Sequence, residues 1–331
     1  MTRLADDWSR IDTGAGLVVP GNRRFFTATG EERLEFLHGQ VTANVTALRP
    51  GMGCAAATLT AQGRPLALFA LYEDGERTWV ATIDTAATRA ALSRFLVADD
   101  CEFEADVEAS GLTIAGPRSA EVLAAAGAPV AASLGDWGIA AATIAGQAVL
   151  LFSRGNLRVP SFDVLACDGE GRASDAAAVT AALEASGGVR VSVSALDIVR
   201  VESGSARYGV DVDDTRIAME ARLEWAIHFA KGCYVGQEVI ERAVSRGRIN
   251  HELCLLEVDG RVLPGAAVEG GGEADVVTSV AVSPRLGRLA LAYLPRASTE
   301  AGTRVTLRGG DDVVEAVVLD WPRPRVLAGR E

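Results

Sequence analysis

Strand-like segments of this chain come in neighbouring pairs joined by short turns, and this pattern restricts the possible fold more than any other feature. Residues 54–60 and 66–72 are apolar runs with strand character, and the turn-like stretch AQGRP joins them. A third run, residues 78–83, follows a turn that contains Asp74 and Gly75, a dipeptide typical of hairpins. Adjacent paired strands favour α+β units over one long parallel sheet.

Segments of helical periodicity alternate with these strands, and the alternation begins again after about residue 110. From about Glu252 the helical periodicity disappears, and short Val- and Leu-rich runs alternate with turns, which is typical of a small antiparallel barrel or sandwich. We expect helices at residues 33–45, 85–97, 119–126, 175–186, 194–201 and 237–245, and further strands at residues 112–115, 148–153, 162–166, 253–258, 276–282, 286–293, 305–307 and 313–319.

The expected fold is therefore α+β in three parts. Residues 1–110 form a first α+β unit, residues 111–245 a second, and residues 246–331 a C-terminal antiparallel β-barrel. We expect the first two units to exchange segments.

Composition excludes several classes of protein. The 331 residues include 44 acidic and 32 basic side chains, which gives a net charge of −12 and argues against a general nucleic-acid binder, although a local basic pocket remains compatible with it. Five cysteines without regular spacing or a CxxC pair argue against a disulfide framework and a metal site. We see no signal peptide and no run of about twenty apolar residues, and therefore expect a cytoplasmic protein without a membrane span.

The most informative segment is AKGCYVGQEVIERAVSRG, residues 230–247. Its first half is loop-like and its second half is helical, so Cys233 lies shortly before a helix N-terminus and two residues after Lys231. A helix N-terminus and a cation both favour a thiolate, which makes Cys233 a candidate reactive thiol. The alternative is a buried cysteine that acts as a small hydrophobic residue.

The octapeptide KGCYVGQE resembles the signature of the YgfZ family, which is KGC, an aromatic residue, one variable residue and GQE. Two further stretches, GEERLEFLHGQVTANVTALRPG and VVTSVAVSPRLGRLALAYLPR, are similar to the N-terminal helix and the C-terminal barrel of that family. Residues 200–211 resemble a segment shared with aminomethyltransferases. The resemblance covers almost the whole chain.

This resemblance implies the fold of the T-protein of glycine cleavage, with two α+β domains around a central folate cleft and a C-terminal β-barrel. It also implies tetrahydrofolate or a derivative as cofactor and a role in the synthesis or repair of iron–sulfur clusters in client enzymes, including those that thiolate tRNA. The implied partners are a folate and iron–sulfur client or assembly proteins, without direct contact to nucleic acid or membrane.

The chain departs from the aminomethyltransferases where their catalytic aspartate stands. The corresponding positions are Ala67 and Leu68, which offer no carboxylate, so aminomethyl transfer by the glycine-cleavage mechanism is not expected. In the stretch GNLRVPSFD only Asp163 aligns with the acids that hold the pterin. Asp163 is either such a ligand or a solvated residue on a strand.

The remaining candidate ligands each have a structural alternative. Arg200 suits folate carboxylates or the pterin oxygen because its guanidinium forms paired hydrogen bonds, or it pairs with Glu202 or a neighbouring acid. The aromatic rings of Tyr234 and Trp225 stack on a pterin or pack internally. Gln40, Thr42 and Asn44 line the cleft or cap the first helix, and Gln237 and Glu238 bind the cofactor or fix the start of the following helix. Lys231 positions a negatively charged group or lowers the pKa of Cys233. We interpret His38, His228 and His251 as structural.

Three functions follow from these residues. The first is a folate-dependent maturation factor in which Cys233 is the functional thiol. The second is a folate-dependent aminomethyltransferase- or demethylase-like enzyme, for which the sequence lacks the catalytic acid. The third is a scaffold of the same fold that acts only through protein contacts.

Overall fold

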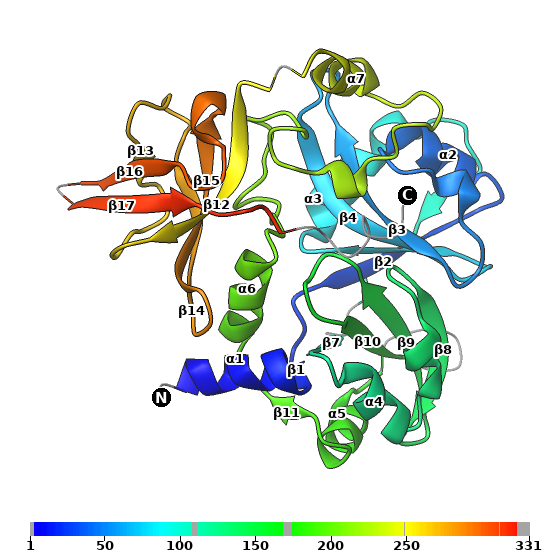
Figure 1. Ribbon diagram of the computed structural model, residues 1–331. Helices are drawn as coiled ribbons and strands as arrows, with labels where there is room; N and C mark the ends of the chain where they lie inside the picture. Colours follow the sequence, from blue (N-terminus) through cyan, green and yellow to red (C-terminus); the bar gives the residue numbers. More distant parts are fainter. Residues whose placement is uncertain (1–2, 108–110, 168–173, 248, 311, 323–331) are drawn as a thin grey trace.

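The computed structural model describes residues 3–322 except residues 108–110, 168–173, 248 and 311. Three β-sheets, each with its own hydrophobic core, surround a central region into which helix α6 projects (Figure 1). The expected α+β class is confirmed. No helix in the part of the chain that the structure describes is long and apolar enough to cross a membrane.

The first sheet has the strand order β3-β4-β5-β2-β6 and is antiparallel throughout. The expected hairpin is present, with Gly53 of β3 opposite Tyr72 of β4. The helix expected at residues 33–45 ends earlier, because Val41 takes an extended conformation with φ −118° and ψ 162°. The elements of this part are β2 (Arg24–Thr29), α2 (Arg33–Gln40), β3 (Gly53–Leu59), β4 (Pro65–Glu73), β5 (Thr78–Thr82), α3 (Thr85–Leu92) and β6 (Glu102–Phe103), with short 3₁₀ helices at Val45–Ala47 and Ser93–Phe95.

The second sheet combines strands from distant parts of the chain in the order β11-β1-β7-β10-β9-β8. Strand β1, near the N-terminus, pairs in parallel with β11 and antiparallel with β7. The N-terminal segment therefore contributes to the sheet of the middle segment, while the division at residues 110 and 245 stays a prediction. The elements are α1 (Arg3–Thr13), β1 (Gly16–Val18), β7 (Leu112–Ala115), α4 (Ser119–Ala125), β8 (Ile139–Ile144), β9 (Gln147–Arg154), β10 (Ser161–Cys167), α5 (Ala177–Ala185) and β11 (Val189–Arg190), with a 3₁₀ helix at Pro129–Ser133.

The third sheet is the expected C-terminal antiparallel structure, in the order β13-β16-β17-β12-β15-β14. It curls until its ends meet, because Val277 donates to the Ala266 carbonyl and Val268 donates to the Asp275 carbonyl. The elements are β12 (His251–Val258), β13 (Ala267–Val268), β14 (Val277–Ser283), β15 (Gly287–Pro295), β16 (Arg304–Gly309) and β17 (Asp312–Val318), with a 3₁₀ helix at Arg296–Ser298.

Two helices connect the sheets. Helix α6 (Val193–Glu202) packs against α1 and against β14 and β15 of the third sheet, and lies between the second and third sheets in Figure 1. Helix α7 (Gln237–Arg246) follows a 3₁₀ helix at Glu224–Ala226 along the chain and lies above the first sheet, at the top of Figure 1. The segment that precedes α7 runs toward α2, which brings the KGCYVGQE stretch to the first sheet rather than to α6.

Candidate functional site

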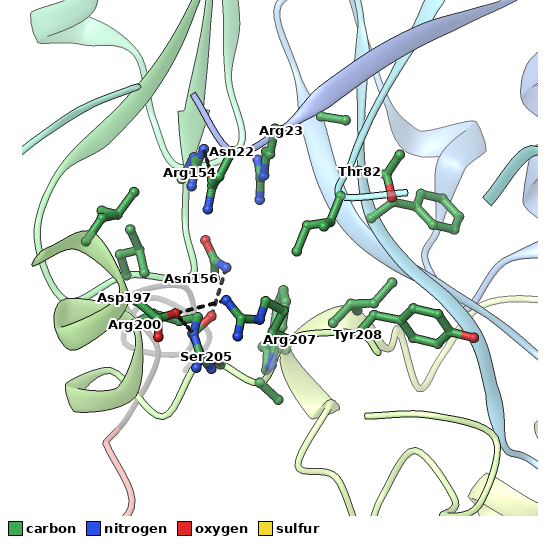
Figure 2. A pocket seen from close by; sticks show the side chains of 18 of the residues that line it. Asn22, Arg23, Thr82, Arg154, Asn156, Asp197, Arg200, Ser205, Arg207 and Tyr208 are labelled. Atoms are coloured by element: carbon green, nitrogen blue, oxygen red, sulfur yellow. Dashed lines mark hydrogen bonds and ion pairs between the residues drawn. The ribbon is translucent and has the colours of Figure 1, made fainter. Parts of the chain in front are cut away.

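A cleft opens between the first sheet, the second sheet and the end of α6, and four arginines line it (Figure 2). Arg23 precedes β2, Arg154 ends β9, Arg200 lies in the last turn of α6, and Arg207 follows α6. Among the described residues that line the cleft, Asp197 is the one with an acidic side chain. The cleft therefore has an excess of positive charge in a chain whose net charge is −12.

Asp163 lies buried behind this cleft and is held by two of its arginines. Arg154 Nε donates to Asp163 Oδ2 over 2.8 Å and its Nη2 donates to Oδ1, while Thr113 donates to Oδ1 over 2.8 Å. Burial alone would raise the pKa of Asp163, but Arg154 and Arg23 hold this pKa below its usual value. Asp163 thus fixes the end of β9, and its role as a pterin ligand stays a prediction.

Arg200 lines the cleft as expected, yet nearly all of its donors are engaged within the protein. Nε donates to Asp197 over 2.7 Å, Nη1 to Asp211 over 2.7 Å and to a backbone carbonyl, and Nη2 to Ser279 over 2.8 Å. Burial opposes the charge on Arg200, but Asp211 and Asp197 raise its pKa above the ordinary value. The neighbouring acids that pair with Arg200 are these two, whereas Glu202 pairs with Arg158.

Arg23 and Arg207 are the two cleft arginines with the fewest and longest side-chain hydrogen bonds, and sequence reasoning missed both. Figure 2 shows them on opposite sides of the hollow. Arg23 makes long contacts of 3.3 and 3.4 Å through Nη1, and Arg207 makes one side-chain hydrogen bond of 3.1 Å, to Asp197. The buried Nε of Arg207 has no hydrogen-bond partner among the described residues. These groups are placed to receive an anion or another acceptor.

Two tryptophans and an asparagine complete the wall of the cleft. Trp225, a candidate stacking residue, lies parallel to Trp137 with ring centroids 6.0 Å apart and planes 5° apart. Trp137 has a φ of 61°, a left-handed conformation that is rare for a bulky side chain and that clusters at functional sites. The amide of Asn156 donates to Ser205, but its buried Oδ1 has no partner within the described chain.

Strand β4, where the resemblance predicts the position of the catalytic aspartate of aminomethyltransferases, presents an apolar side chain to the cleft. Leu68 lines the cleft, whereas Ala67 is buried in the core of the first sheet. This arrangement follows from the alternation of side chains along β4. A carboxylate is thus missing at the position that reaches the hollow.

The KGCYVGQE segment lies outside the cleft. Cys233 is exposed, four residues before α7 begins, and the left-handed Gly236 caps the helix. Lys231 turns away from solvent instead: its Nζ donates to the carbonyls of Val41, over 2.6 Å, and of His38. Burial lowers the pKa of Lys231 to about 8. The structure thus places the lysine as a clamp on the end of α2, and its predicted role beside the thiol stays a prediction.

The other residues of this segment also have internal partners. Lys231 Nζ lies 5.0 Å from the centre of the half-buried Tyr234 ring. Gln237 donates to Glu241 over 2.6 Å, and Glu238 pairs with Arg242, both with the i,i+4 spacing of an exposed helix face. None of these side chains is among the residues that line the cleft.

Gln40, Thr42 and Asn44 do not line the cleft of Arg200, which corrects that expectation. Thr42 is buried, where its hydroxyl donates to the Ala226 carbonyl over 2.6 Å and accepts from a backbone N–H of β3. Gln40 and Asn44 line separate surface hollows. The end of α2 is therefore fastened to the segment 226–231 by hydrogen bonds from Thr42 and Lys231 to backbone carbonyls. Whether Gln40, Thr42 or Asn44 binds a cofactor stays a prediction.

Comparisons with known proteins agree with this architecture. The family described as GCVT N-terminal domain matches residues 4–231. Aminomethyltransferases from Nostoc sp. (strain PCC 7120) and Streptomyces coelicolor are 26% and 29% identical to this chain; the matches cover 94% of this chain in both cases and 85% and 87% of the relatives. The crystal structure of glycine cleavage system aminomethyltransferase T from Bartonella henselae superposes with a TM-score of 0.81 at 20% identity, covering 96% of this chain and 89% of that one. This likeness confirms the expected T-protein-like fold.

Proposed function

The chain belongs to the GCVT N-terminal domain family, and from this membership we propose that it is a folate-binding protein of the YgfZ type that assists the synthesis or repair of iron–sulfur clusters. Tetrahydrofolate or a derivative would lie in the central cleft. The client proteins include enzymes that thiolate tRNA, and Cys233 is the functional thiol.

The chemistry of the cleft supports a folate as its ligand. A pterin carries amino and ring N–H donors that need acceptors when they are buried, and the unpartnered Oδ1 of Asn156 is such an acceptor. The stacked indoles of Trp137 and Trp225 offer an aromatic wall to a planar ring. Arg23 and Arg207 offer free donors to carboxylates. The observation that carries the proposal is that one cleft combines the unpartnered Oδ1 of Asn156, the stacked rings of two tryptophans and two arginines with available donors.

The second candidate function is aminomethyl transfer, which the names of the relatives favour. A transferase of this kind needs a group that exchanges protons with, or stabilises charge on, the reacting nitrogen. Leu68 presents an isobutyl group to the cleft, which does neither. We therefore propose folate binding without this transfer reaction.

The KGCYVGQE segment supports the maturation role. Its thiol is exposed and is not among the residues that line the cleft, so a partner protein can reach it. Complementation tests this part of the proposal: in cells that lack the chain, wild type restores a tRNA-thiolating iron–sulfur enzyme and Cys233→Ala does not. Full restoration by Cys233→Ala would remove the thiol from the proposed function.

Calorimetry with tetrahydrofolate and its 5-formyl derivative tests the cleft. We expect a dissociation constant in the micromolar range, about −8 kcal/mol. Arg207→Gln should weaken binding about tenfold by removing an available donor, whereas Arg200→Gln should chiefly lower stability because it leaves the buried Asp211 without its counterion. Absence of binding up to about millimolar ligand would contradict the folate proposal and favour a scaffold. Loss of binding in Arg200→Gln at unchanged stability would restore Arg200 as the ligand.

A further inference from the structure

A second hollow, more apolar than the cleft, runs between α6, the start of α1 and the C-terminal sheet. We call it the α6 groove, and its volume is about 600 Å³. Figure 1 shows α1, α6 and β14 on the side of the molecule away from α2 and α7. The α6 groove shares Val193, Asp197 and Arg207 with the cleft, and the two hollows are therefore neighbours.

The rim of the α6 groove consists of large apolar side chains that remain in water. Val282, Leu263 and Val193 are 61%, 59% and 53% exposed, and Leu4 is 38% exposed. They come from three separate parts of the chain and meet around one hollow, above a floor of buried residues that includes Ile198. An apolar surface of this kind, bordered by polar residues, marks an interaction site.

Two arginines of the same groove lack counterions. Arg261 and Arg288 are exposed, and neither side chain makes a hydrogen bond or an ion pair with any residue that the structure describes. Other exposed arginines differ in this respect: Arg118 pairs with Glu121 and Arg308 with Glu269, whereas Arg94 and Arg304 have no ion pair with a described residue. The groove is thus a local positive site on an acidic chain.

We propose that the α6 groove is a docking surface for a partner protein, which inserts a segment with one apolar face and acidic flanks. The apolar face would cover Val193, Leu263 and Val282, and its carboxylates would pair with Arg261 and Arg288. A small molecule fits less well, because ligand sites bury most of their ligand, while the rim here stays half-exposed. An amphipathic helix that lies in an apolar groove meets both requirements.

The test uses the full chain and two labelled peptides. One peptide has three repeats of Leu-Glu-Glu-Leu-Leu-Glu-Glu, and in the other every Glu is replaced by Lys. The charge of the whole chain repels the Glu peptide and attracts the Lys peptide, so preference for the Glu peptide requires local positive charge. Fluorescence anisotropy at about 0.15 M salt measures both affinities.

We expect wild type to prefer the Glu peptide, and Arg261→Glu/Arg288→Glu to lose about tenfold or more of that affinity. The matched control is Arg94→Glu/Arg304→Glu, which changes the net charge equally at exposed arginines outside the groove, and it should bind as wild type does. Leu263→Asp should also weaken binding of the Glu peptide, because it removes part of the apolar rim while both arginines stay in place. Preference of wild type for the Lys peptide, or equal losses in the two double variants, would overturn the proposal.

Two further outcomes would replace the protein partner by another occupant. Sedimentation of wild type as a dimer that Arg261→Glu/Arg288→Glu dissociates would identify a second copy of this chain. Binding of decanoate that depends on both arginines, without binding of the Glu peptide, would identify a small anionic amphiphile. Folate calorimetry on the same variants should be unchanged, which separates this surface from the central cleft.

Discussion

Lys231 offers the sharpest test of how the KGCYVGQE segment works, because its ammonium group faces the protein and not the thiol. Lys231→Met removes both hydrogen bonds to the end of α2 and leaves the Val41 carbonyl buried without its donor. An orphaned buried carbonyl costs about 1–3 kcal/mol. The His38 carbonyl is only partly buried, so water replaces the lost donor there at little cost.

Methionine also avoids the cost of burying a charge, the same cost that lowers the pKa of Lys231 to about 8. We therefore expect a net loss of about 1–2 kcal/mol at neutral pH, measured by urea denaturation. Hydrogen exchange should localise this loss to the backbone amides of residues 36–42, since the clamp holds the end of α2.

The same residue gives a pH dependence with a definite sign. The pKa of Lys231 in the folded chain, about 8, lies below the ordinary value of about 10.4. Between these values the unfolded chain binds more protons than the folded chain, so the stability contributed by Lys231 rises with pH. The difference in unfolding free energy between wild type and Lys231→Met should therefore grow from about pH 8 to about pH 10.

Labelling of Cys233 by iodoacetamide distinguishes the clamp from the alternative role. If Lys231 holds α2, Lys231→Met lowers stability and accelerates exchange in α2 whatever happens to the thiol. Unchanged stability together with slower labelling of Cys233 would refute the reasoning, because it would show that the lysine acts on the thiolate. Gln237→Met, on the exposed face of α7, is the control that should change neither quantity.

Three other substitutions or measurements test the packing around the site. Asp163→Asn leaves the buried arginine of β9 without its counterion and should cost about 3–5 kcal/mol in urea unfolding; a loss below about 1 kcal/mol would contradict the pairing. Gly53→Ala places a Cβ 2.5 Å from the Trp137 carbonyl and closer still to the Leu71 carbonyl, and should cost about 2–3 kcal/mol with a lower melting temperature; an unchanged melting temperature would argue against both close contacts. Cys233 should react with Ellman's reagent in the native protein much faster than Cys101 or Cys254, whose burial raises the pKa of each thiol to about 11; equal rates would contradict the burial.

Local pattern was sufficient to predict the elements whose side chains alternate or whose turns are distinctive. The β3–β4 hairpin and strand β7 were expected close to where they lie. The α1 helix was missed because Trp8 and Ile11 are its buried residues and they leave no long apolar run. Strand β8, IAAATI, was missed because alanines give little contrast between its faces. Strands β1 and β11 are only three and two residues long and lie far apart in the sequence. Their pairing was missed because local sequence patterns carry no information on contacts between distant segments.

The candidate site was predicted in its residue types better than in its geometry. Sequence reasoning identified Arg200 and Trp225, which line the cleft, and Cys233, which is exposed. It missed Arg23 and Arg207, since a single arginine in a loop carries no local signal of what it faces. The sequence also contains no indication of the positive φ of Trp137, because tertiary contacts impose this conformation on a residue type that disfavours it.

The deeper reason is that a sequence lists charges without showing which of them are already neutralised. Arg200 and Lys231 have the residue types that a ligand or a thiolate needs, yet the fold engages both: acids and a serine satisfy Arg200, and backbone carbonyls satisfy Lys231. A buried donor with internal partners stabilises the fold and has little left for a ligand. Arg207, with an orphaned Nε, has the opposite property, since its own chain leaves a donor that a ligand can satisfy. Ranking the polar atoms of a cleft by their missing partners therefore selects different residues than ranking them by type, and calorimetry on Arg200→Gln against Arg207→Gln compares the two rankings directly.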